Sequence, residues 1–214
     1  MTDLEYELNI IRENFADKQD LIIFDIGAYD CYHSSTFKAH FPHATIYAFE
    51  ADERNFEKMA RHSHTLNLVH MACSDVDGTV RFYPTTQFNG QSYSGSGSVC
   101  VPEVRGDSNE GKCNDGLFFD LQGIEVNSTR IDTFCKARNI NHIDYLHIDV
   151  QGAEMKVMQG LGDIRPTFIF AEVCELLAYQ TGITIDEFNT FMASLGYDLV
   201  DVLQFDNLYK WVRN

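Results

Sequence analysis

Acidic residues recur where buried strands are expected to end. Five apolar runs along the chain lead into Asp25, Glu50, Asp75, Asp149 and Glu172. The carboxyl ends of parallel strands meet at one edge of an open sheet, and ligands bind at that edge. A single acidic residue after a strand is usually a helix cap, but capping is a weaker explanation for five in succession. The row of carboxylates therefore favours a ligand site, and one for a cationic ligand.

Gly27 and Glu50 have the spacing of an adenosine-binding site. A glycine after the first strand lets a ligand approach the backbone, and an acid about 20 residues later accepts ribose hydroxyls. A dinucleotide needs G-x-G-x-x-G to hold its pyrophosphate on a helix N-terminus, but Tyr29 and Tyr32 stand at the second and third glycine positions. S-adenosylmethionine has no phosphate, and its ammonium and sulfonium suit the nearby Asp25. The spacing and the charges together favour S-adenosylmethionine.

The elements that position these residues alternate between strands and helices, which predicts βαβ units and a parallel sheet. Strands are expected at 21–24, 45–49, 67–72, 144–149 and 167–172, and helices at 3–17, 32–41, 52–62, 152–160 and 184–195. Residues 197–203 and 208–212 read as a hairpin at the C-terminal end. We expect an α/β fold with a doubly wound, mostly parallel, Rossmann-like sheet. Helices cover both faces of this sheet, and an antiparallel strand closes its C-terminal end. The whole of 1–214 is interpreted as one domain, with an N-terminal helix within 1–20.

A long insertion rich in glycine and serine separates the third and fourth of these strands. It covers 84–122 and shows no helical or strand period. Loops of this length are uncommon unless they are functional or disordered. Two hypotheses follow, a tolerated surface insertion and a lid that covers the substrate. The flanking runs 79–83 and 124–128 are strand-like and could pair with each other.

Composition excludes several classes of function. The 214 residues carry 16 Lys and Arg against 32 Asp and Glu, a net charge of −16. Such a surface repels nucleic acid and anionic membranes, so neither is expected as a partner. No run reaches the ~18 apolar residues of a membrane span, and the N-terminus lacks the pattern of a signal peptide. The six cysteines include no Cys-x-x-Cys pair, which favours reduced thiols and a cytoplasmic protein.

At several blocks the sequence resembles the FkbM-type methyltransferases. The blocks are Phe24-Asp25-Ile26-Gly27-Ala28, Phe49-Glu50, residues 127–132, residues 147–154 (His-Ile-Asp-Val-Gln-Gly-Ala-Glu), Arg165-Pro166 and a strand ending in Glu172. The block at 147–154 is the most specific of these. The resemblance implies the class I fold of S-adenosylmethionine-dependent methyltransferases. It also implies O-methylation of a hydroxyl, often on a sugar or a natural product.

The same resemblance implies roles for individual residues. Asp25 and Gly27 would line the methionine end of the cofactor, Glu50 would hold the ribose, and Ser74 with Asp75 would lie near the adenine. Ala28, Tyr29 and Ala51 are also expected to bind the cofactor, and Asp149 would face the transferred methyl group.

Three positions depart from the family pattern. Cys31 replaces a glycine, His147 replaces a lysine and Gln151 replaces a glutamate. Cys31 would add a side chain beside the cofactor and weaken its binding, and the other two changes remove a pair of charges near the site. These departures leave an alternative to the enzyme, a catalytically silent module that binds S-adenosylmethionine on the same fold.

His147 and Asp149 are the catalytic candidates. Alternate residues of a strand share a face, so the two could form a base and its orienting partner for removing a proton from a hydroxyl. The competing interpretations are a core histidine and a helix-capping aspartate. Asp149 and Glu172 could instead hold Mg²⁺, which would lower the pKa of the acceptor hydroxyl. The leading hypothesis is O-methylation of a small-molecule or glycan acceptor, such as a sugar or a secondary metabolite.

Overall fold

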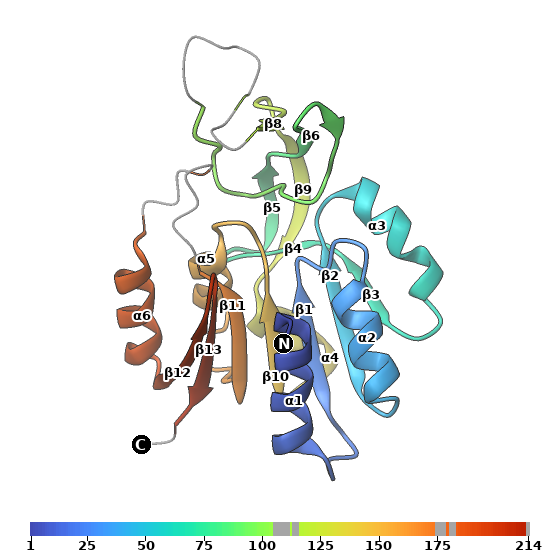
Figure 1. The fold of residues 1–214 in the computed structure, drawn as a ribbon, viewed down its shortest axis with the longest axis vertical. Coiled ribbons are helices and arrows are strands. Elements are labelled where there is room, and N and C mark those ends of the chain that lie inside the picture. The colour runs from blue at the N-terminus through green and yellow to red at the C-terminus, as the bar shows by residue number, and fades with distance from the viewer. Residues whose placement is uncertain (105–111, 113–115, 174–178, 180–182, 213–214) are drawn as a thin grey trace.

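A seven-stranded sheet forms the centre of the protein in the computed structural model, which describes residues 1–104, 112, 116–173, 179 and 183–212 (Figure 1). The strand order is β12-β13-β11-β10-β1-β2-β3. The bounds are β1 (Ile22–Ile26), β2 (Thr45–Glu50), β3 (Asn67–His70), β10 (Tyr145–Ile148), β11 (Phe168–Glu172), β12 (Tyr197–Leu203) and β13 (Asp206–Trp211). Neighbouring strands are parallel except around β13, which is antiparallel to both β11 and β12. The expected mostly parallel sheet with an antiparallel C-terminal strand is confirmed, and so is the hairpin.

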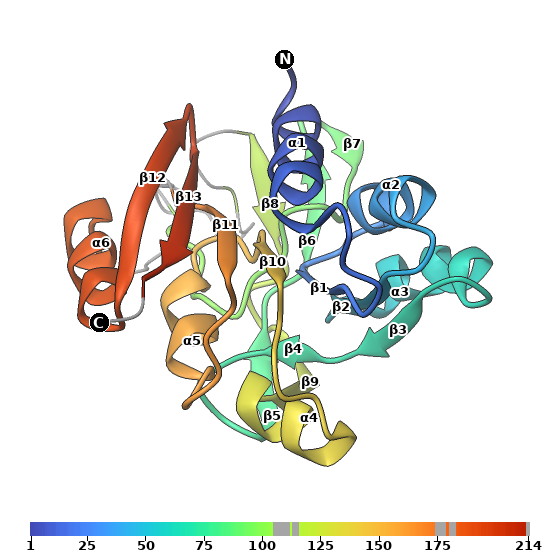
Figure 2. The same cartoon turned by 90° about the horizontal axis from the view of Figure 1, so that it is seen from below.

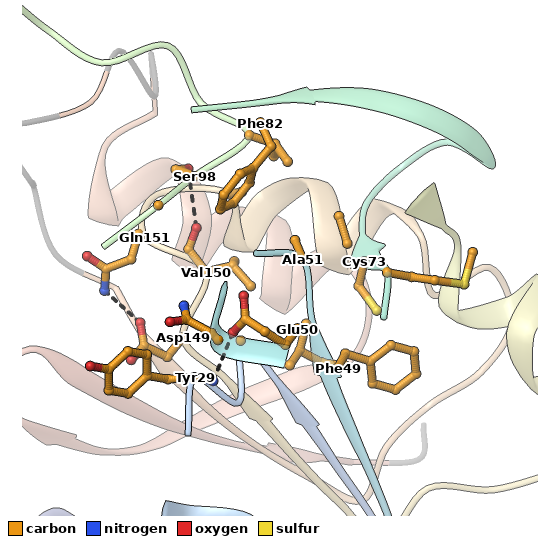
Figure 3. A pocket seen from close by; sticks show the side chains of 18 of the residues that line it. Tyr29, Phe49, Glu50, Ala51, Cys73, Phe82, Ser98, Asp149, Val150 and Gln151 are labelled. Carbon is orange, nitrogen blue, oxygen red and sulfur yellow. Dashed lines mark hydrogen bonds between the residues drawn. The ribbon is translucent and has the colours of Figure 1, made fainter. Parts of the chain in front are cut away.

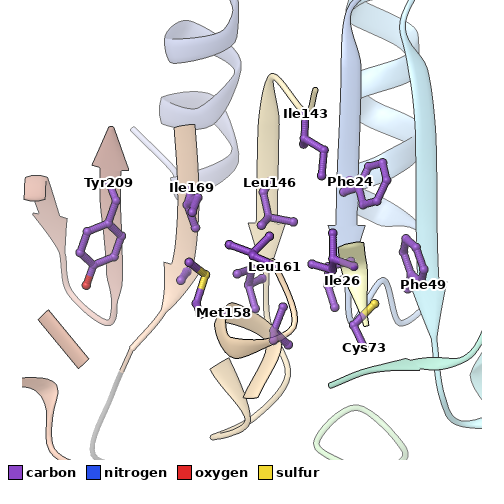
Figure 4. Packing of buried hydrophobic residues seen from close by; sticks show 14 of the residues in the cluster. Phe24, Ile26, Phe49, Cys73, Ile143, Leu146, Met158, Leu161, Ile169 and Tyr209 are labelled. Atoms are coloured by element: carbon purple, nitrogen blue, oxygen red, sulfur yellow. The ribbon is translucent and has the colours of Figure 1, made fainter. Parts of the chain in front are cut away.

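Helices cover both faces of this sheet (Figure 2). They are α1 (Asp3–Phe15), α2 (Tyr32–His40), α3 (Glu53–Met59), α4 (Ile131–Arg138), α5 (Glu154–Gln159) and α6 (Ile185–Ser194), with a 3-10 turn η1 (Ala60–His62) after α3. The first three helices pack in one hydrophobic cluster and the last three in another. Side chains alternate along the strands, so Phe24 and Leu146 face the cluster of the last three helices while Ile23 and Tyr145 face the other. Figure 4 shows the cluster of the last three helices, beside α5.

The N-terminal helix α1 carries a carboxylate on its apolar face. The helix begins with a capping box between Thr2 and Glu5. Glu7 is buried on the sheet and accepts a hydrogen bond of 2.9 Å from the Tyr145 hydroxyl. The neighbouring Tyr6 donates a 2.9 Å hydrogen bond to Asp201, at the far end of the chain. Polar contacts therefore join α1 to two strands that come much later in the sequence.

The segment between β3 and β10 differs from the expectation. The third strand, expected at 67–72, divides at Met71, and its second part β4 (Ala72–Cys73) leaves the main sheet to pair with β9 (Ile124–Thr129). The predicted pairing of the runs that flank the insertion is confirmed, because β5 (Gly78–Phe82) is antiparallel to β9.

The insertion itself also contains strands. β6 (Thr85–Phe88) pairs with β7 (Gln91–Ser92) and β8 (Leu117–Phe119), so the absence of regular structure expected at 84–122 is wrong for the described residues. These elements stand over the carboxyl edge of the main sheet (Figure 1).

No described helix is long and apolar enough to cross a membrane. Of the six cysteines, 113 and 174 fall outside the described residues. The other four, Cys31, Cys73, Cys100 and Cys135, are buried free thiols.

Candidate active site

A cavity opens at the carboxyl edge of the sheet, where β1, β2 and β10 end (Figure 3). It encloses about 550 Å³, including its open mouth. One wall consists of the turns after these strands, with Gly27, Tyr29, Glu50, Ala51, Asp149 and Gln151. The opposite wall comes from residues 71–73, Phe82 and residues 94–99. The cavity thus lies at the edge that the row of carboxylates predicted.

Gly27 brings the turns after β1 and β10 together. Its φ is +89°, and a Cβ at this position would overlap the main-chain carbonyl oxygen of Asp149. The Asp149 N–H donates a 2.9 Å hydrogen bond to the Ile26 carbonyl, which holds the two turns in register. A glycine is therefore required here by the contact between two backbones, as well as by the left-handed conformation.

Glu50 ties together the turns after β1 and β2. One carboxylate oxygen accepts a 2.9 Å hydrogen bond from the Tyr29 N–H (Figure 3). The other accepts a 2.7 Å bond from the Asp52 N–H. Burial raises the pKa of Glu50 to about 7 despite these two donors. Each carboxylate oxygen has a second lone pair, so Glu50 can still accept hydrogen bonds from the hydroxyl groups of a ligand in the cavity.

Asp149 faces the same cavity and is joined to Glu172 by the side-chain amide of Gln151. The amide nitrogen lies 2.6 Å from an Asp149 oxygen and 2.6 Å from a Glu172 oxygen. Burial and the adjacent Asp149 carboxylate raise the pKa of Glu172 to about 9.

The Mg²⁺ site expected between Asp149 and Glu172 does not fit this arrangement. The side-chain amide of Gln151 occupies the position between the two carboxylates and donates a hydrogen to each, which leaves no place for a metal ion between them. In the part of the chain that the structure describes, no three His, Cys, Asp or Glu side chains gather around a metal position.

His147 lies outside the cavity lining. Its ring is buried beneath the sheet edge, 3.0 Å from a Glu7 oxygen and stacked on His33 at 4.6 Å between centroids. Burial lowers the pKa of His147, but the Glu7 carboxylate more than compensates and raises it to about 10. The expected partnership with Asp149 is wrong in this geometry. β10 ends at Ile148, so Asp149 lies in the following turn, where strand alternation no longer applies.

Four residues that were predicted to bind the cofactor are also absent from the cavity lining. Asp25 accepts a 2.5 Å hydrogen bond from the Ser34 hydroxyl, and Ala28 packs in the core. The Ser74 hydroxyl donates a 2.8 Å bond to Asp75, whose carboxylate lies 3.9 Å from the Lys156 ammonium. Because β4 leaves the main sheet, Cys73 and the two residues before it line the cavity in place of Ser74 and Asp75.

Comparison with known proteins identifies the family. A family model of the methyltransferase FkbM domain matches residues 25–199. This chain belongs to the FkbM methyltransferase family. It is 28% identical over 170 residues to the 2-O-methyltransferase NoeI of Sinorhizobium fredii, a match that covers 77% of this chain and 68% of that protein. It is 27% identical over 189 residues to Methyltransferase 1 of Beauveria bassiana, covering 81% and 74%.

A solved structure shares the fold of this FkbM domain. A Staphylococcus aureus protein assigned to the caffeoyl-CoA O-methyltransferases superposes with a TM-score of 0.52 at 8% identity, covering 98% of this chain and 83% of that chain. The fold is that of the class I S-adenosylmethionine-dependent methyltransferases. Family and fold together identify the chain as an S-adenosylmethionine-dependent methyltransferase.

Cys31 does not obstruct the cavity of this FkbM methyltransferase. Its side chain is fully buried in the core beside Ala28 and Phe37. The expectation that it would lie beside the cofactor is therefore wrong. Its backbone is left-handed, with a φ of +66°, which is the conformation that favours glycine at this point of the turn.

The hypothesis of a lid at 84–122 did not identify which residues of the insertion form a wall of the cavity in this FkbM domain. The side-chain amide of Asn55 in α3 donates a 2.8 Å hydrogen bond to the Ser94 carbonyl and accepts a 2.6 Å bond from the Ser94 hydroxyl. The Ser98 hydroxyl donates a 3.3 Å bond to the Val150 carbonyl (Figure 3). These contacts hold residues 94–99 against the turns of the main sheet. The only signal in the sequence was the glycine and serine content of the segment.

Proposed function

We propose that this FkbM methyltransferase binds S-adenosylmethionine in the cavity and methylates a hydroxyl of a small polar acceptor such as a sugar. The observation that carries the proposal is the position of Glu50, a buried carboxylate that holds two ligand-facing turns and still has lone pairs for ribose hydroxyls. The choice of oxygen is supported by the similarity to NoeI, which is named a 2-O-methyltransferase.

The residues around the cavity fit this cofactor. Phe49, Cys73 and Phe82 supply an apolar wall for an adenine ring next to Glu50. Asp149 stands further along the lining and supplies negative charge for a cationic group. When bound, S-adenosylmethionine provides an electrophilic methyl group carried on a sulfonium.

The residues of the chain align the reactants and accept the proton that the acceptor hydroxyl loses. Alignment supplies much of the rate of an in-line displacement. The Gly27–Asp149 contact and the Ser98–Val150 hydrogen bond fix the turns that provide this alignment. A hydroxyl acceptor must lose its proton during attack, and Asp149 is the carboxylate that lines the cavity where a methyl group would be presented.

The second candidate is a silent binding module. It is supported by the hydrogen bond that ties the Asp149 carboxylate to Gln151, because a base already engaged with a donor is a weaker base. In this case the cofactor would bind and no acceptor would be methylated.

Calorimetric titration of the purified protein with S-adenosylmethionine and S-adenosylhomocysteine, with NADH as the control ligand, tests the proposal. We expect both sulfur compounds to bind and NADH to fail. Glu50→Gln should weaken binding by about tenfold or more, because one of the acceptor oxygens becomes a donor. Glu57→Ala, at an exposed position of α3, should bind as the wild type does.

A panel of hydroxylated acceptors with radiolabelled cofactor then separates enzyme from binding module. Label transfer to a hydroxyl supports the enzyme. Cofactor binding without transfer to any acceptor favours the silent module, and absence of cofactor binding in folded protein contradicts both.

A further inference from the structure

The side chain of Gln151 connects two carboxyl groups of different kinds. Asp149 lines the cavity, whereas Glu172 ends β11 and lies behind the lining. One amide nitrogen approaches an oxygen of each to 2.6 Å. An amide nitrogen carries two hydrogens, so it donates one to each carboxyl group. Asp149 and Glu172 therefore form a connected pair, of which one member meets the cavity.

The backbone holds this arrangement in place. Gln151 has a φ of +55° and Gly152 has a φ of +93°, two successive left-handed residues in the turn after β10. A left-handed conformation is costly for a residue other than glycine, and such strain is concentrated at functional sites. The turn thus uses an unfavourable conformation to direct the Gln151 amide back across the ends of β10 and β11.

The surroundings disfavour two full negative charges. The charged groups that face Glu172 are Asp149 from the turn after β10, Glu154 from α5 and Asp206 from β13, and all three raise its pKa. His147 acts in the opposite direction on Asp206, because its positive charge lowers the pKa of that carboxyl group. His147 is itself hydrogen-bonded to Glu7. When two carboxyl groups lie this close together, one of them generally keeps its proton. Asp149 and Glu172 are therefore expected to hold one proton between them.

We propose that Asp149 and Glu172, bridged by Gln151, share one proton and act together as the acceptor of the proton that the substrate hydroxyl loses. The inference rests on the proposed function. Asp149 is the catalytic residue, because it meets the cavity, while Gln151 and Glu172 are positioning residues that act through it. The pair releases its shared proton when a sulfonium occupies the cavity, since a nearby positive charge favours the ionised form.

The transfer step then balances in atoms and charge. The hydroxyl oxygen forms a bond to the methyl carbon as the carbon–sulfur bond breaks, and the electron pair of that bond stays on sulfur. The hydroxyl proton passes to the Asp149–Glu172 pair. Sulfur loses one positive charge and the pair gains one, so the net charge of the site stays constant.

Proton counting by calorimetry tests this inference without any acceptor. Wild type and Glu172→Gln are titrated with S-adenosylmethionine and with S-adenosylhomocysteine at pH 8, in buffers of different ionisation enthalpy. The amino group of the cofactor contributes equally in both proteins. We expect wild type to release more protons than Glu172→Gln on binding the sulfonium compound, by up to about one. With S-adenosylhomocysteine, which has no charge on sulfur, the two proteins should release the same number.

The pH dependence of affinity gives a second readout. Between pH 7 and 9, wild type should gain affinity for S-adenosylmethionine relative to Glu172→Gln, by up to about tenfold per pH unit. Gln151→Leu removes both donors from the pair and should move this gain to higher pH. Asp206→Asn removes a carboxylate that raises the pKa of Glu172 without touching Gln151, so it should move this gain in the opposite direction, to lower pH.

The outcomes are distinguishable. Thermal unfolding and normal binding of S-adenosylhomocysteine establish that Glu172→Gln is folded. Equal proton release by wild type and Glu172→Gln, with S-adenosylmethionine bound to both, overturns the shared proton and leaves the proposed function standing. Failure of S-adenosylmethionine to bind the folded wild type overturns both.

Discussion

The α carbon of Gly27 lies directly against the main-chain carbonyl of Asp149, with no room between them for a side chain. This contact joins the turn after β1 to the turn after β10, the two turns from which Tyr29 and Gln151 reach the cavity. The floor of the site is therefore set by a contact between two backbones, and the side chains that face the cavity depend on it.

Gly27→Ala should destabilise the protein and abolish cofactor binding. The new Cβ would overlap the Asp149 carbonyl and would also require a left-handed alanine, a cost of about 2–4 kcal/mol in the free energy of unfolding. Gly78→Ala is the matched control, because Gly78 has a φ of +111° but no atom lies within 4 Å of the position that its Cβ would take. Urea unfolding of both variants measures the difference. Equal losses would show that backbone conformation alone explains the effect.

Cys31→Gly should be more stable than Cys31→Ala. Both variants lose the buried thiol, but only glycine adopts the φ of +66° without strain. The expected difference in the free energy of unfolding is about 1 kcal/mol in favour of glycine. Thermal and urea unfolding of the two variants provide the comparison, and a more stable alanine variant would contradict the strain at this position.

Asn55→Ala should loosen the wall formed by residues 94–99. The variant removes both hydrogen bonds between the Asn55 side chain and Ser94, so we expect affinity for S-adenosylhomocysteine to fall by about tenfold and limited proteolysis near this segment to become faster. Asn67→Ala is the control, since its amide donates to the Ile46 carbonyl at the other end of β2. The same loss of affinity in both variants would argue against a specific role for the wall.

Glu154→Gln should stabilise the protein at high pH. Burial raises the pKa of Glu154 to about 7 from an ordinary 4.5. The folded state therefore holds a proton that the unfolded state has lost. The stability that this retained proton contributes to the folded state is complete below pH 4.5 and disappears as the pH rises through 7. Glutamine keeps the oxygen that accepts from the Gly152 N–H. Urea unfolding should show equal stability near pH 4.5 and a gain of up to about 3 kcal/mol for the variant at pH 8.5.

Glu187→Gln is the matched control for this measurement. Glu187 lies in the first turn of α6, and hydrogen bonds from Thr184 lower its pKa. This variant should show no gain at high pH. If the difference in stability between wild type and Glu154→Gln does not change as the pH rises, Glu154 ionises normally in the folded protein.

Glu7→Gln should lower the pKa of His147 and destabilise α1. Without the Glu7 carboxylate, burial dominates, and we expect the pKa to fall from about 10 by ~2 units or more. Because the folded pKa is raised, the stability that this ion pair contributes is complete below 6.5 and is lost as the pH rises through 10. Breaking a buried pair costs about 3–5 kcal/mol at neutral pH. Imidazole NMR titration and urea unfolding measure both effects.

Tyr145→Phe separates the ion pair from the hydrogen bond. It removes the hydroxyl that donates to Glu7 but leaves His147 in place. We expect a loss of about 1 kcal/mol and a pKa of His147 that stays above its ordinary value. A pKa unchanged in Glu7→Gln would contradict the role assigned to this carboxylate.

The central sheet could be predicted because its strands are continuous apolar runs. The strands expected at 21–24 and 144–149 are present at Ile22–Ile26 and Tyr145–Ile148, since a strand covered on both faces has few alternatives. The division of the third strand could not be read in this way. β4 leaves the sheet because its partner is Thr129, more than fifty positions later, and local composition contains no trace of that pairing.

The site could be predicted only in part for the same physical reason. Gly27 and Asp149 follow strands directly, Glu50 is the last residue of one, and all three line the cavity as expected. The position of His147 depends on Glu7, which lies on a different element. One signal was present in the sequence, because Glu7 falls on the apolar face of α1 between Leu4 and Leu8. A carboxylate in that position requires a buried partner.

The contacts of α1 also determine when the protein can complete its folding. α1 is synthesised before β10 and β12, so Glu7 finds its partners on β10, and Tyr6 finds Asp201, only after these later strands have been made. Contacts between such distant residues form slowly, because the intervening chain must first be ordered. Until β10 has been synthesised, α1 therefore exposes an apolar face with an unpaired carboxylate, and the later β12–β13 hairpin completes its docking site.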